Sequence, residues 1–556
     1  MTYLARSPGT CVPNTGHPLM HGARKFIGIV AVITAGFTTQ SSLRAGTCTI
    51  NAATTYQTID GFGFSSAWSG QLTSAQGATL FGTGAGQLGF SLLRVRIDPT
   101  DNWATEAANA TIAHSYGAKV LGTPWTPPAG FKSNDNTIGG TLNTSEYSAY
   151  ASYLNSAASS LGLDYVSMQN EPDAVVNYES CSWTGATMET WCQTNAPLVG
   201  KPIVMPESEG FNDAYSDPTL NNTTAVKNIT IVAGHIYGGG NIVHTNALNH
   251  GKHVWMTEHY NNGVDIGTAL TDAKEVSDCM YNDMSAYFWW YAFYPGAACD
   301  LVNGSTPQLN GYALAQFAAF IRPGYVSIES TYNPTTNIYV TAYTGRGTVV
   351  IVAINLGTTS VSQPFALQNI TVPYVTPTTT STAGNMVKGA SINVSGGAFT
   401  DTLPAQSVTT FVSGIANGTY KIINLNSGSS LNVDGAGTAN GTDCSQWAYV
   451  DVSQEQWTVT SIGNGEYEIV GVGSGKALNV SGASKVSGGQ VSIWSYVGAP
   501  QEQWTFAPTS NGNYTITSVN SGLVLDVAGA SKANGANVDQ LTPNNGTNQQ
   551  WSFQAP

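Results

Sequence analysis

The C-terminal part of the chain is one sequence unit repeated three times. A tyrosine opens each unit and a tryptophan closes it, and both series have a spacing of 47 residues. The tyrosines are Tyr420, Tyr467 and Tyr514, and the tryptophans are Trp457, Trp504 and Trp551. One unit of short strands and glycine-rich turns cannot bury its apolar face alone, so the three units must share a core. The repeat therefore predicts a closed threefold β structure over residues 418–556, with the tryptophans in its core.

Two motifs in each unit resemble those of the ricin-type β-trefoil, carbohydrate-binding module family 13. The first is Leu-Asn-Val or Leu-Asp-Val, and the second is the closing Gln-Glu-Gln-Trp or Asn-Gln-Gln-Trp. In that family a polar residue of the first motif binds sugar hydroxyls, and a later aromatic residue stacks on the sugar. The resemblance implies sugar binding by Asn432, Trp447, Asn479, Trp494, Asp526 and Asn544. The third unit departs from the pattern, because Leu541 replaces the aromatic residue and only Asn544 would bind beside Asp526. A purely structural trefoil is the alternative.

Eight short apolar segments, separated by helix-length stretches, precede the repeat. They span residues 61–65, 91–97, 119–124, 165–169, 203–206, 229–236, 253–257 and 286–291. This alternation predicts a (β/α)8 barrel over residues 46–324, in which polar residues at the C-terminal strand ends form the active site. Two of these ends carry a glutamate, Glu171 in VSMQNEPD and Glu258 in VWMTEHY.

Two carboxylates on a rigid scaffold suit glycoside hydrolysis. One carboxyl group protonates the leaving oxygen and the other attacks the anomeric carbon, and a separation of about 5–5.5 Å gives retention. Two glutamates are also compatible with a metal site. However, the histidines form no helix-spaced ligand set, and His259 beside Glu258 would point to the other side of its strand. We therefore expect an enzyme that uses neither a metal nor a cofactor.

The motifs around both glutamates resemble those of glycoside hydrolase family 30, and most closely its bacterial glucuronoxylan endoxylanase branch. The matching stretches are Asn170-Glu171-Pro172, Thr257-Glu258, IDGFGFSSAW (59–68), LLRVRID (92–98), ESCSWTGATMETW (179–191), GHIYGG (234–239) and GYALAQFAAFIRPGYV (311–326). The resemblance covers about residues 48–414. It implies a retaining endo-β-1,4-xylanase.

The resemblance also implies roles for individual residues. Glu171 is then the acid/base and Glu258 the nucleophile. Asn170 hydrogen-bonds the sugar 2-hydroxyl, and Tyr237 orients or stabilises the nucleophile. Further candidates are Arg94 or Arg96 on the second strand and the sugar platforms Trp125, Trp289 and Trp290. We expect one of the two adjacent tryptophans to face the core, because neighbouring residues of a strand point to opposite sides.

One stretch departs from that branch of the family. Its members usually carry arginines just after the eighth strand, which bind the uronic acid branch of xylan, whereas residues 289–296 read WWYAFYPG. No arginine occurs between Arg96 and Arg322, so a substrate carboxylate would lack its bidentate partner. We expect cleavage of xylan without a strict need for glucuronic acid branches. The alternatives are another activity of the family (endo-β-1,6-galactanase, β-1,6-glucanase or β-xylosidase) and a non-catalytic lectin.

Residues 325–414 have a different sequence pattern from the barrel. Strand-like runs at 348–355, 391–394 and 408–413 alternate with turns rich in threonine and glycine, which predicts a β-sandwich side domain. The family resemblance implies that this domain borrows a strand from around 48–53. Residues 413–418 form a short linker to the trefoil.

The N-terminus reads as an export signal. Arg24 and Lys25 precede the apolar run FIGIVAVITAGF (26–37), and small residues follow it. The run is too short to span a bilayer and has the order of a secretory signal over residues 1–45, with Met20 as a possible true start. We therefore expect a secreted, extracellular protein with disulfide candidates among Cys48, Cys181, Cys192, Cys279, Cys299 and Cys444. The local pairs are Cys181 with Cys192 and Cys279 with Cys299.

The low content of charged residues and the negative net charge exclude some classes of binding partner. Only 9% of the residues are charged, against about 25% in ordinary globular proteins, and the formal net charge is -14. Nucleic acids and anionic lipid bind through lysine and arginine, so this chain suits neither. We expect a monomer whose partner is a neutral polysaccharide, namely xylan.

Overall fold

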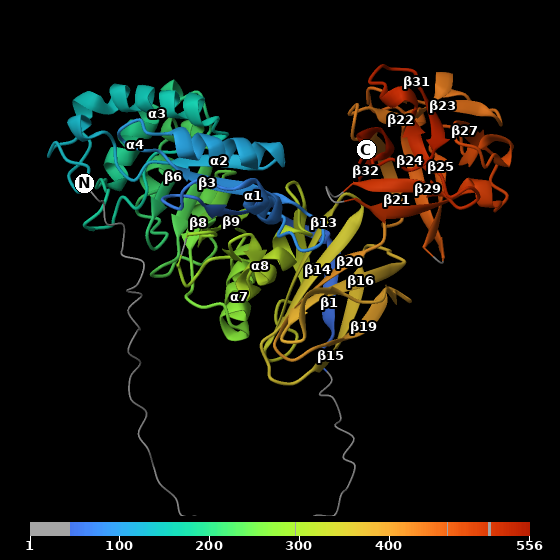
Figure 1. Cartoon of the computed structure of the whole chain (residues 1–556), viewed down its shortest axis with the longest axis horizontal. Helices are drawn as coiled ribbons and strands as arrows, with labels where there is room; N and C mark the ends of the chain where they lie inside the picture. Colours follow the sequence, from blue (N-terminus) through green and yellow to red (C-terminus); the bar gives the residue numbers. More distant parts are fainter. Residues whose placement is uncertain (1–44, 295, 464, 510–512) are drawn as a thin grey trace, which may run out of the picture.

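A computed structural model describes residues 45–294, 296–463, 465–509 and 513–556. Nearly all of the predicted export signal, residues 1–44, lies outside the described residues. The chain forms a barrel, a sheet-rich side domain and a C-terminal trefoil, with the side domain in contact with both of the others (Figure 1). No helix in the described ranges is long and apolar enough to cross a membrane.

Eight parallel strands close into the predicted barrel. They are β2 (Gly61–Ser65), β3 (Leu92–Arg96), β4 (Lys119–Thr123), β5 (Tyr165–Ser167), β6 (Ile203–Ser208), β7 (Ile231–His235), β8 (His253–His259) and β9 (Ala286–Tyr291). Strand β9 pairs with β2, which closes the ring. The barrel interior is filled by apolar side chains such as Leu121, Trp255 and Phe288, so it is a packed core and the active site must lie at its rim.

Helices surround the barrel. They are α1 (Ser74–Phe81), α2 (Ala104–Ser115), α3 (Tyr147–Leu161), α4 (Gly185–Thr194), α5 (Asp217–Asn221), α6 (Thr245–Asn249), α7 (Ile266–Tyr281) and α8 (Leu309–Ala318). Helix α7 shows how the sequence sets their limits. The Asp265 side chain accepts hydrogen bonds from the amides of Gly267 and Thr268 and so caps the first turn. Leu270, Ala273 and Val276 recur at helical spacing and are buried on one face.

The side domain is built on one hydrogen-bonded sheet. Its strands are β1 (Cys48–Thr58), β12 (Val326–Ser330), β13 (Ile338–Gly345), β14 (Thr348–Asn355), β15 (Val361–Gln368), β16 (Tyr374–Ser381), β17 (Gly384–Lys388), β18 (Ile392–Asn393), β19 (Ala398–Leu403) and β20 (Ser407–Ser413). Strand β1 pairs antiparallel with β12 and parallel with β15, and Figure 1 shows this blue strand among the yellow and orange ones. Phe399 on β19 lies 5.4 Å from Phe411 on β20, ring centre to ring centre. Since β19 ends the sheet, the sheet folds over itself as a sandwich. A small hairpin of β10 (Val302–Asn303) and β11 (Thr306–Pro307) lies in the segment between β9 and α8.

The trefoil has four strands in each repeat. They are β21 (Gly418–Asn424), β22 (Ser430–Val433), β23 (Thr442–Trp447), β24 (Gln456–Gly463), β25 (Glu466–Gly471), β26 (Ala477–Val480), β27 (Gly489–Trp494), β28 (Gln503–Pro508), β29 (Tyr514–Ser518), β30 (Val524–Val527), β31 (Ala536–Leu541) and β32 (Trp551–Gln554). The three closing tryptophans are fully buried, as predicted. Each indole N–H donates to the backbone carbonyl of the leucine in its own Leu-x-Val motif, at 2.9, 2.9 and 3.0 Å.

The expected disulfides are absent from the described residues. All six described cysteines are buried, and no disulfide joins them. Neither predicted local pair is joined by a disulfide, and the side chains of Cys181 and Cys192 face different neighbours. Cys181 lies near Lys132 and the backbone of Leu142, whereas the sulfur of Cys192 lies 3.8 Å from that of Met168. Burial raises the pKa of Cys192 to about 12, which keeps it a thiol.

Candidate active site

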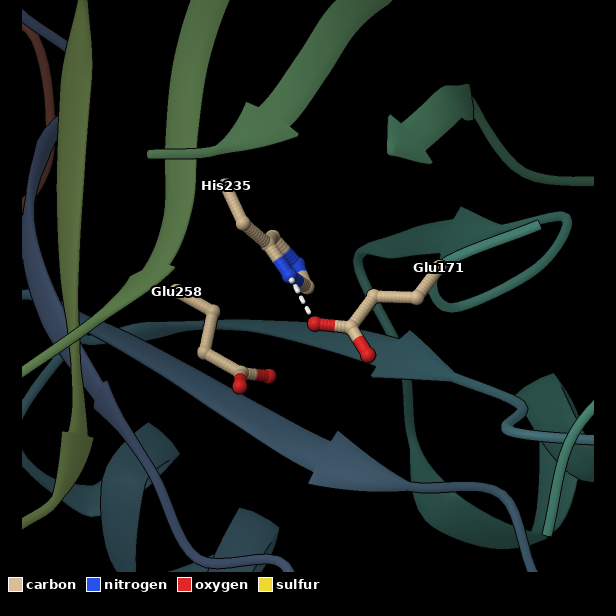
Figure 2. A group of neighbouring side chains, drawn as sticks. All are labelled: Glu171, His235 and Glu258. Carbon is tan, nitrogen blue, oxygen red and sulfur yellow. Dashed lines mark hydrogen bonds and ion pairs between the residues drawn. The ribbon is translucent and has the colours of Figure 1, made fainter. Parts of the chain in front are cut away.

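Glu171 and Glu258 lie at the C-terminal rim of the barrel and face each other. Glu258 is the last residue but one of strand β8, and Glu171 follows the short strand β5. Both side chains are buried. One oxygen of Glu171, one oxygen of Glu258 and a nitrogen of His235 all lie within 4.8 Å of one another. Figure 2 shows the three side chains converging, His235 and Glu258 from strands β7 and β8 and Glu171 from the segment after β5.

Glu171 is held by its side chain and its backbone. His235 Nδ1 lies 3.0 Å from Glu171 Oε1, and the Tyr178 hydroxyl donates to Oε2 at 3.4 Å. The backbone of Glu171 is left-handed, with φ 40°, and its N–H donates to the carbonyl of Glu207 at 2.9 Å. Such a conformation is costly for glutamate and is typical of functional sites.

Glu258 accepts two hydrogen bonds that favour its ionised form. Arg94 Nη1 donates to Oε2 at 2.6 Å, and the Tyr237 hydroxyl donates to Oε1 at 3.0 Å. Burial raises the pKa of Glu258, and Glu171 adds to that rise, while the cations His235 and Arg94 oppose it. The geometry therefore fits a carboxylate that is buried yet stabilised as an anion.

Arg94, rather than Arg96, is the arginine of the site. It is fully buried and uses all three of its nitrogens: besides Glu258, it donates to Asn170 Oδ1 at 2.6 Å and, through Nε, to Glu207 Oε1 at 3.1 Å. Arg96 instead pairs with Asp98 and Glu179 at the rim. The structure resolves an alternative that the sequence left open. The two arginines are two residues apart and lie on the same face of β3, but Arg94 is fully buried, whereas Arg96 is the last residue of the strand and reaches the rim.

Two central residues of the site were not predicted from the sequence. His235 ends strand β7 and Glu207 lies near the end of β6. The rule that found the catalytic pair, a glutamate directly after an apolar strand, also fits Glu207 in IVMPES. His235 lies inside the GHIYGG stretch, yet a single histidine after an apolar strand carries no signal that distinguishes a site residue from a core residue.

An aromatic wall lies beside the glutamates. Trp125, Trp290 and Ala67 form a cluster against which Trp68 packs. The guanidinium of Arg94 lies 4.6 Å from the ring centre of Trp125 and 5.9 Å from that of Trp290. Trp68 was not predicted, and it has φ 57°, a strained value for tryptophan.

Trp289 was proposed as a sugar platform, and the structure argues against it. The side chain has no exposed surface and lies in the core between the barrel and the helices. Its indole N–H donates to the carbonyl of Cys299 at 2.8 Å. Trp290, the next residue, points to the other side of the strand, toward Trp125, as period-two alternation requires.

The three atoms that converge in Figure 2 are of a kind that binds metal ions. A divalent cation there would lie close to the Arg94 guanidinium, whose Nη1 is 2.6 Å from Glu258. It would also displace the hydrogen bond between His235 and Glu171. Like-charge repulsion and the existing pairing therefore favour a hydrogen-bonded network of ion pairs, and we assign no metal site.

Comparison with known proteins decides the family. Glucuronoxylanase XynC of Bacillus subtilis (strain 168) is 38% identical over 393 residues, which are 66% of this chain and 92% of that protein. The chain belongs to glycoside hydrolase family 30. The solved family 30 subfamily 8 xylanase Xyn30A from Clostridium acetobutylicum is 42% identical, with a TM-score of 0.63, and is matched over 66% of this chain and 99% of its own. A family 30 endoxylanase from Clostridium papyrosolvens C71 is 37% identical over the same shares, with a TM-score of 0.61.

This family 30 glycoside hydrolase carries an appended lectin-like domain. The model for a ricin-type beta-trefoil lectin domain-like family matches residues 409–495 and 500–556. The first two repeats present exposed platforms, since Trp447 and Trp494 are 43% and 44% exposed. In both, the predicted asparagine lies next to a serine: Asn432 Nδ2 donates to Ser445 at 3.2 Å, and Asn479 Nδ2 lies 3.4 Å from Ser492.

The third repeat of the family 30 chain has a different pocket. Asn548 Nδ2 donates to Asp526 Oδ1 at 2.6 Å, and Asp539 lies directly opposite Asp526 on the paired strand. Asn544, the predicted partner, instead accepts a hydrogen bond from the Gly546 N–H at 2.8 Å and so stabilises a turn. Asn548 was missed because it belongs to the closing motif, which the sequence assigns to the core.

Proposed function

We propose that this protein is a secreted, retaining endo-β-1,4-xylanase that hydrolyses the xylan backbone by double displacement. One observation carries the proposal. Oxygen atoms of Glu171 and Glu258 lie within 4.8 Å of each other, near the carboxyl separation of about 5–5.5 Å that retaining enzymes use and below the 6.5–9.5 Å of inverting ones. The xylanase and glucuronoxylanase relatives support xylan as the substrate.

In the first step Glu258 attacks the anomeric carbon while Glu171 protonates the leaving glycosidic oxygen. The hydrogen bonds from Arg94 and Tyr237 keep Glu258 ionised and oriented. Asn170, whose carbonyl oxygen is held by Arg94, keeps its amide N–H groups for the sugar 2-hydroxyl. The products are a free xylan end and a glycosyl ester of Glu258.

In the second step Glu171 acts as the base. It removes a proton from a water molecule, which attacks the anomeric carbon and releases Glu258. His235, 3.0 Å from Glu171, is placed to stabilise the anion that Glu171 becomes after it has given up its proton. One residue can therefore be acid first and base second.

We propose that glucuronic acid branches are not strictly required. In the described part of the loop after β9, residues 292–294 and 296–301, no side chain is cationic. The loop instead contains a buried carboxyl group, that of Asp300. The Tyr294 N–H donates to Asp300 Oδ1 at 2.8 Å. Burial raises the pKa of Asp300 to about 7. A substrate carboxylate would meet no counter-charge here.

The trefoil is proposed to bind xylan through the first two repeats. Trp447 and Trp494 offer exposed faces for stacking, with Asn432 and Asn479 as hydroxyl partners. The third repeat would bind by hydrogen bonds alone. Because each such contact is weak, two or more sites acting on one polymer supply the affinity.

The domain limits remain those expected from the sequence. We propose an export signal over 1–45, a barrel over 46–324, a side domain over 325–414 and a trefoil over 418–556, in a protein that acts as a monomer. The pairing of β1 with β12 and β15 supports the N-terminal strand as a shared element.

Product analysis on four polymers tests the function. Linear xylan, glucuronoxylan, β-1,6-galactan and β-1,6-glucan are incubated with the full chain and with Glu258→Gln as the matched inactive control. We expect oligomers from both xylans, with the newly formed reducing ends first in the β configuration by NMR, and none with the variant. Hydrolysis confined to a β-1,6-linked polymer, or release of xylose alone, would overturn the proposal.

The branch preference has its own readout. If cleavage sites on glucuronoxylan kept a fixed distance from each branch and linear xylooligomers were untouched, independence from glucuronic acid would be refuted. Equal rates on linear and branched chains are expected.

A further inference from the structure

Glu207 is a third buried glutamate in the catalytic network, and the mechanism above gives it no task. Its carboxylate accepts hydrogen bonds from Arg94 Nε at 3.1 Å and from the Thr123 hydroxyl at 3.0 Å. His235 Nε2 lies 3.9 Å from it. The side chain has no exposed surface, so it touches no sugar. Any effect of Glu207 on the reaction must pass through its neighbours.

We propose that Glu207 is a positioning residue whose carboxylate holds both Arg94 and a protonated His235 between the two catalytic glutamates. This inference rests on the proposed function, because it concerns the same acid/base and nucleophile. The inference goes further, because it assigns control of the protonation of Glu171 and Glu258 to Glu207, which acts on them through Arg94 and His235.

The first set of contacts connects Glu207 to the nucleophile Glu258 through Arg94. The guanidinium of Arg94 is planar, so fixing Nε also fixes the directions of the two terminal nitrogens. These point at Glu258 and Asn170, both at 2.6 Å. Without the Glu207 carboxylate, Nε would retain only the Thr123 hydroxyl, at 3.2 Å.

The second set of contacts connects Glu207 to the acid/base Glu171 through His235. The two ring nitrogens of His235 face Glu171 at 3.0 Å and Glu207 at 3.9 Å, and both nitrogens carry protons only in the imidazolium form. Burial alone would lower the pKa of His235, yet Glu258, Glu171 and Glu207 raise it to about 9. Burial would raise the pKa of Glu207, but Arg94 and His235 lower it to about 2.

The charge balance shows what Glu207 contributes. Arg94 from β3 and His235 from β7 face Glu207, with the hydroxyls of Thr123 and Ser167. These two cations also interact with Glu171 after β5 and with Glu258 from β8. Two cations and three carboxyl groups are neutral together when one carboxyl group keeps its proton. Glu171 needs that proton at the start of the reaction. With Glu207 uncharged, the set is neutral when Glu171 has already lost it.

Glu207→Gln therefore has a specific effect. Loss of a buried anion lowers the pKa of every group coupled to it, so the alkaline limb of kcat/KM against pH shifts to lower pH, by about one unit. We expect kcat to fall at least about tenfold, while KM stays within about threefold because Glu207 touches no substrate.

Thr123→Val is the matched control. It removes the hydroxyl that touches both Arg94 and Glu207 and leaves the charge of Glu207 in place. Its kcat falls, but its alkaline limb stays at the wild-type position. An unshifted limb in Glu207→Gln, or an equal shift in Thr123→Val, would overturn the proposal.

A second measurement needs no active variant, only a His235→Asn variant that folds well enough to keep the signals of the other histidines in place. In the full-length wild-type protein labelled with ¹⁵N-histidine, the His235 signals are identified by their loss in His235→Asn. We expect both ring nitrogens to report imidazolium at pH 7, and a neutral ring would refute the inference. No substrate is involved, so a wild-type protein that failed to cleave xylan would refute the proposed function alone.

Discussion

Single side chains decide what the Glu171–Glu258 pair can do. An isolated buried carboxyl group takes up a proton and is useless as a nucleophile. Glu258 escapes this because two donors, a guanidinium and a phenol, converge on separate oxygens. Glu171 faces an imidazole and a phenol instead. Two identical residues thus receive different roles from their neighbours.

The phenol of Tyr237 is the part of this arrangement that is easiest to remove. Tyr237→Phe deletes one hydrogen bond to a charged group, worth about 1.5–3 kcal/mol, so kcat should fall about tenfold to a hundredfold. The acidic limb of the rate profile should move to higher pH, because the carboxylate has lost a donor. Tyr116→Phe, at the exposed end of α2, is the control. Unchanged kcat in Tyr237→Phe would show that Arg94 alone orients Glu258.

Among the secondary-structure elements, those marked by a regular pattern of apolar residues or by a repeat are the easiest to predict from the sequence. All eight barrel strands were predicted, with ends within a few residues of those observed, because each is an apolar run bounded by polar turns. The catalytic glutamates followed from their place at strand ends. His235 did not, because a single histidine after an apolar strand carries no signal that marks a site residue. The choice of Arg94 over Arg96 did not either, because both lie on one face of β3 and only their depth in the barrel separates them.

The repeats of the trefoil differ in a way that predicts their binding. Trp447 and Trp494 are exposed platforms, and Leu541 occupies the same place in the third unit. Trp447→Ala and Trp494→Ala should each weaken binding to insoluble xylan several-fold, and together far more, because avidity requires two sites. Leu541→Ala is the matched control and should bind as the wild type does. A double variant that still binds fully in pull-down assays would indicate a structural trefoil.

The trefoil and the side domain are in closer contact than the predicted linker suggests. The predicted linker packs between the domains: Ile415 and Ala416 are buried, and the Ala416 N–H donates to Gly347 at 2.7 Å. All three tyrosines that open the repeats are buried at this junction. Tyr420 donates to the Ala416 carbonyl at 2.9 Å, Tyr467 lies against Tyr374, and Tyr514 lies beside Thr348. The threefold end of the trefoil is thus packed against the side domain.

Buried acids and His235 together predict how the stability of the whole molecule depends on pH. Burial raises the pKa of Asp272 to about 8, and the surrounding carboxylates raise that of His235 to about 9 against the effect of burial. A group whose pKa is higher in the folded state stabilises the fold below its unfolded pKa, and that stability is lost as the pH rises through the folded value. Glu207, with its pKa lowered to about 2, acts oppositely, and its contribution is lost only in strong acid.

The free energy of unfolding should therefore be greatest in mild acid, near pH 5, and decrease toward pH 9. Since one pH unit corresponds to about 1.4 kcal/mol, Asp272 contributes on the order of 6 kcal/mol, which is lost between about pH 4 and 8. His235 contributes on the order of 3 kcal/mol, which is lost between about pH 6.5 and 9. Calorimetry at constant ionic strength measures this as a falling Tm. Asp272→Asn, which stays neutral throughout, should flatten the fall between pH 5 and 8, and a wild-type Tm that rises over that interval would show that these groups are not buried in the folded protein.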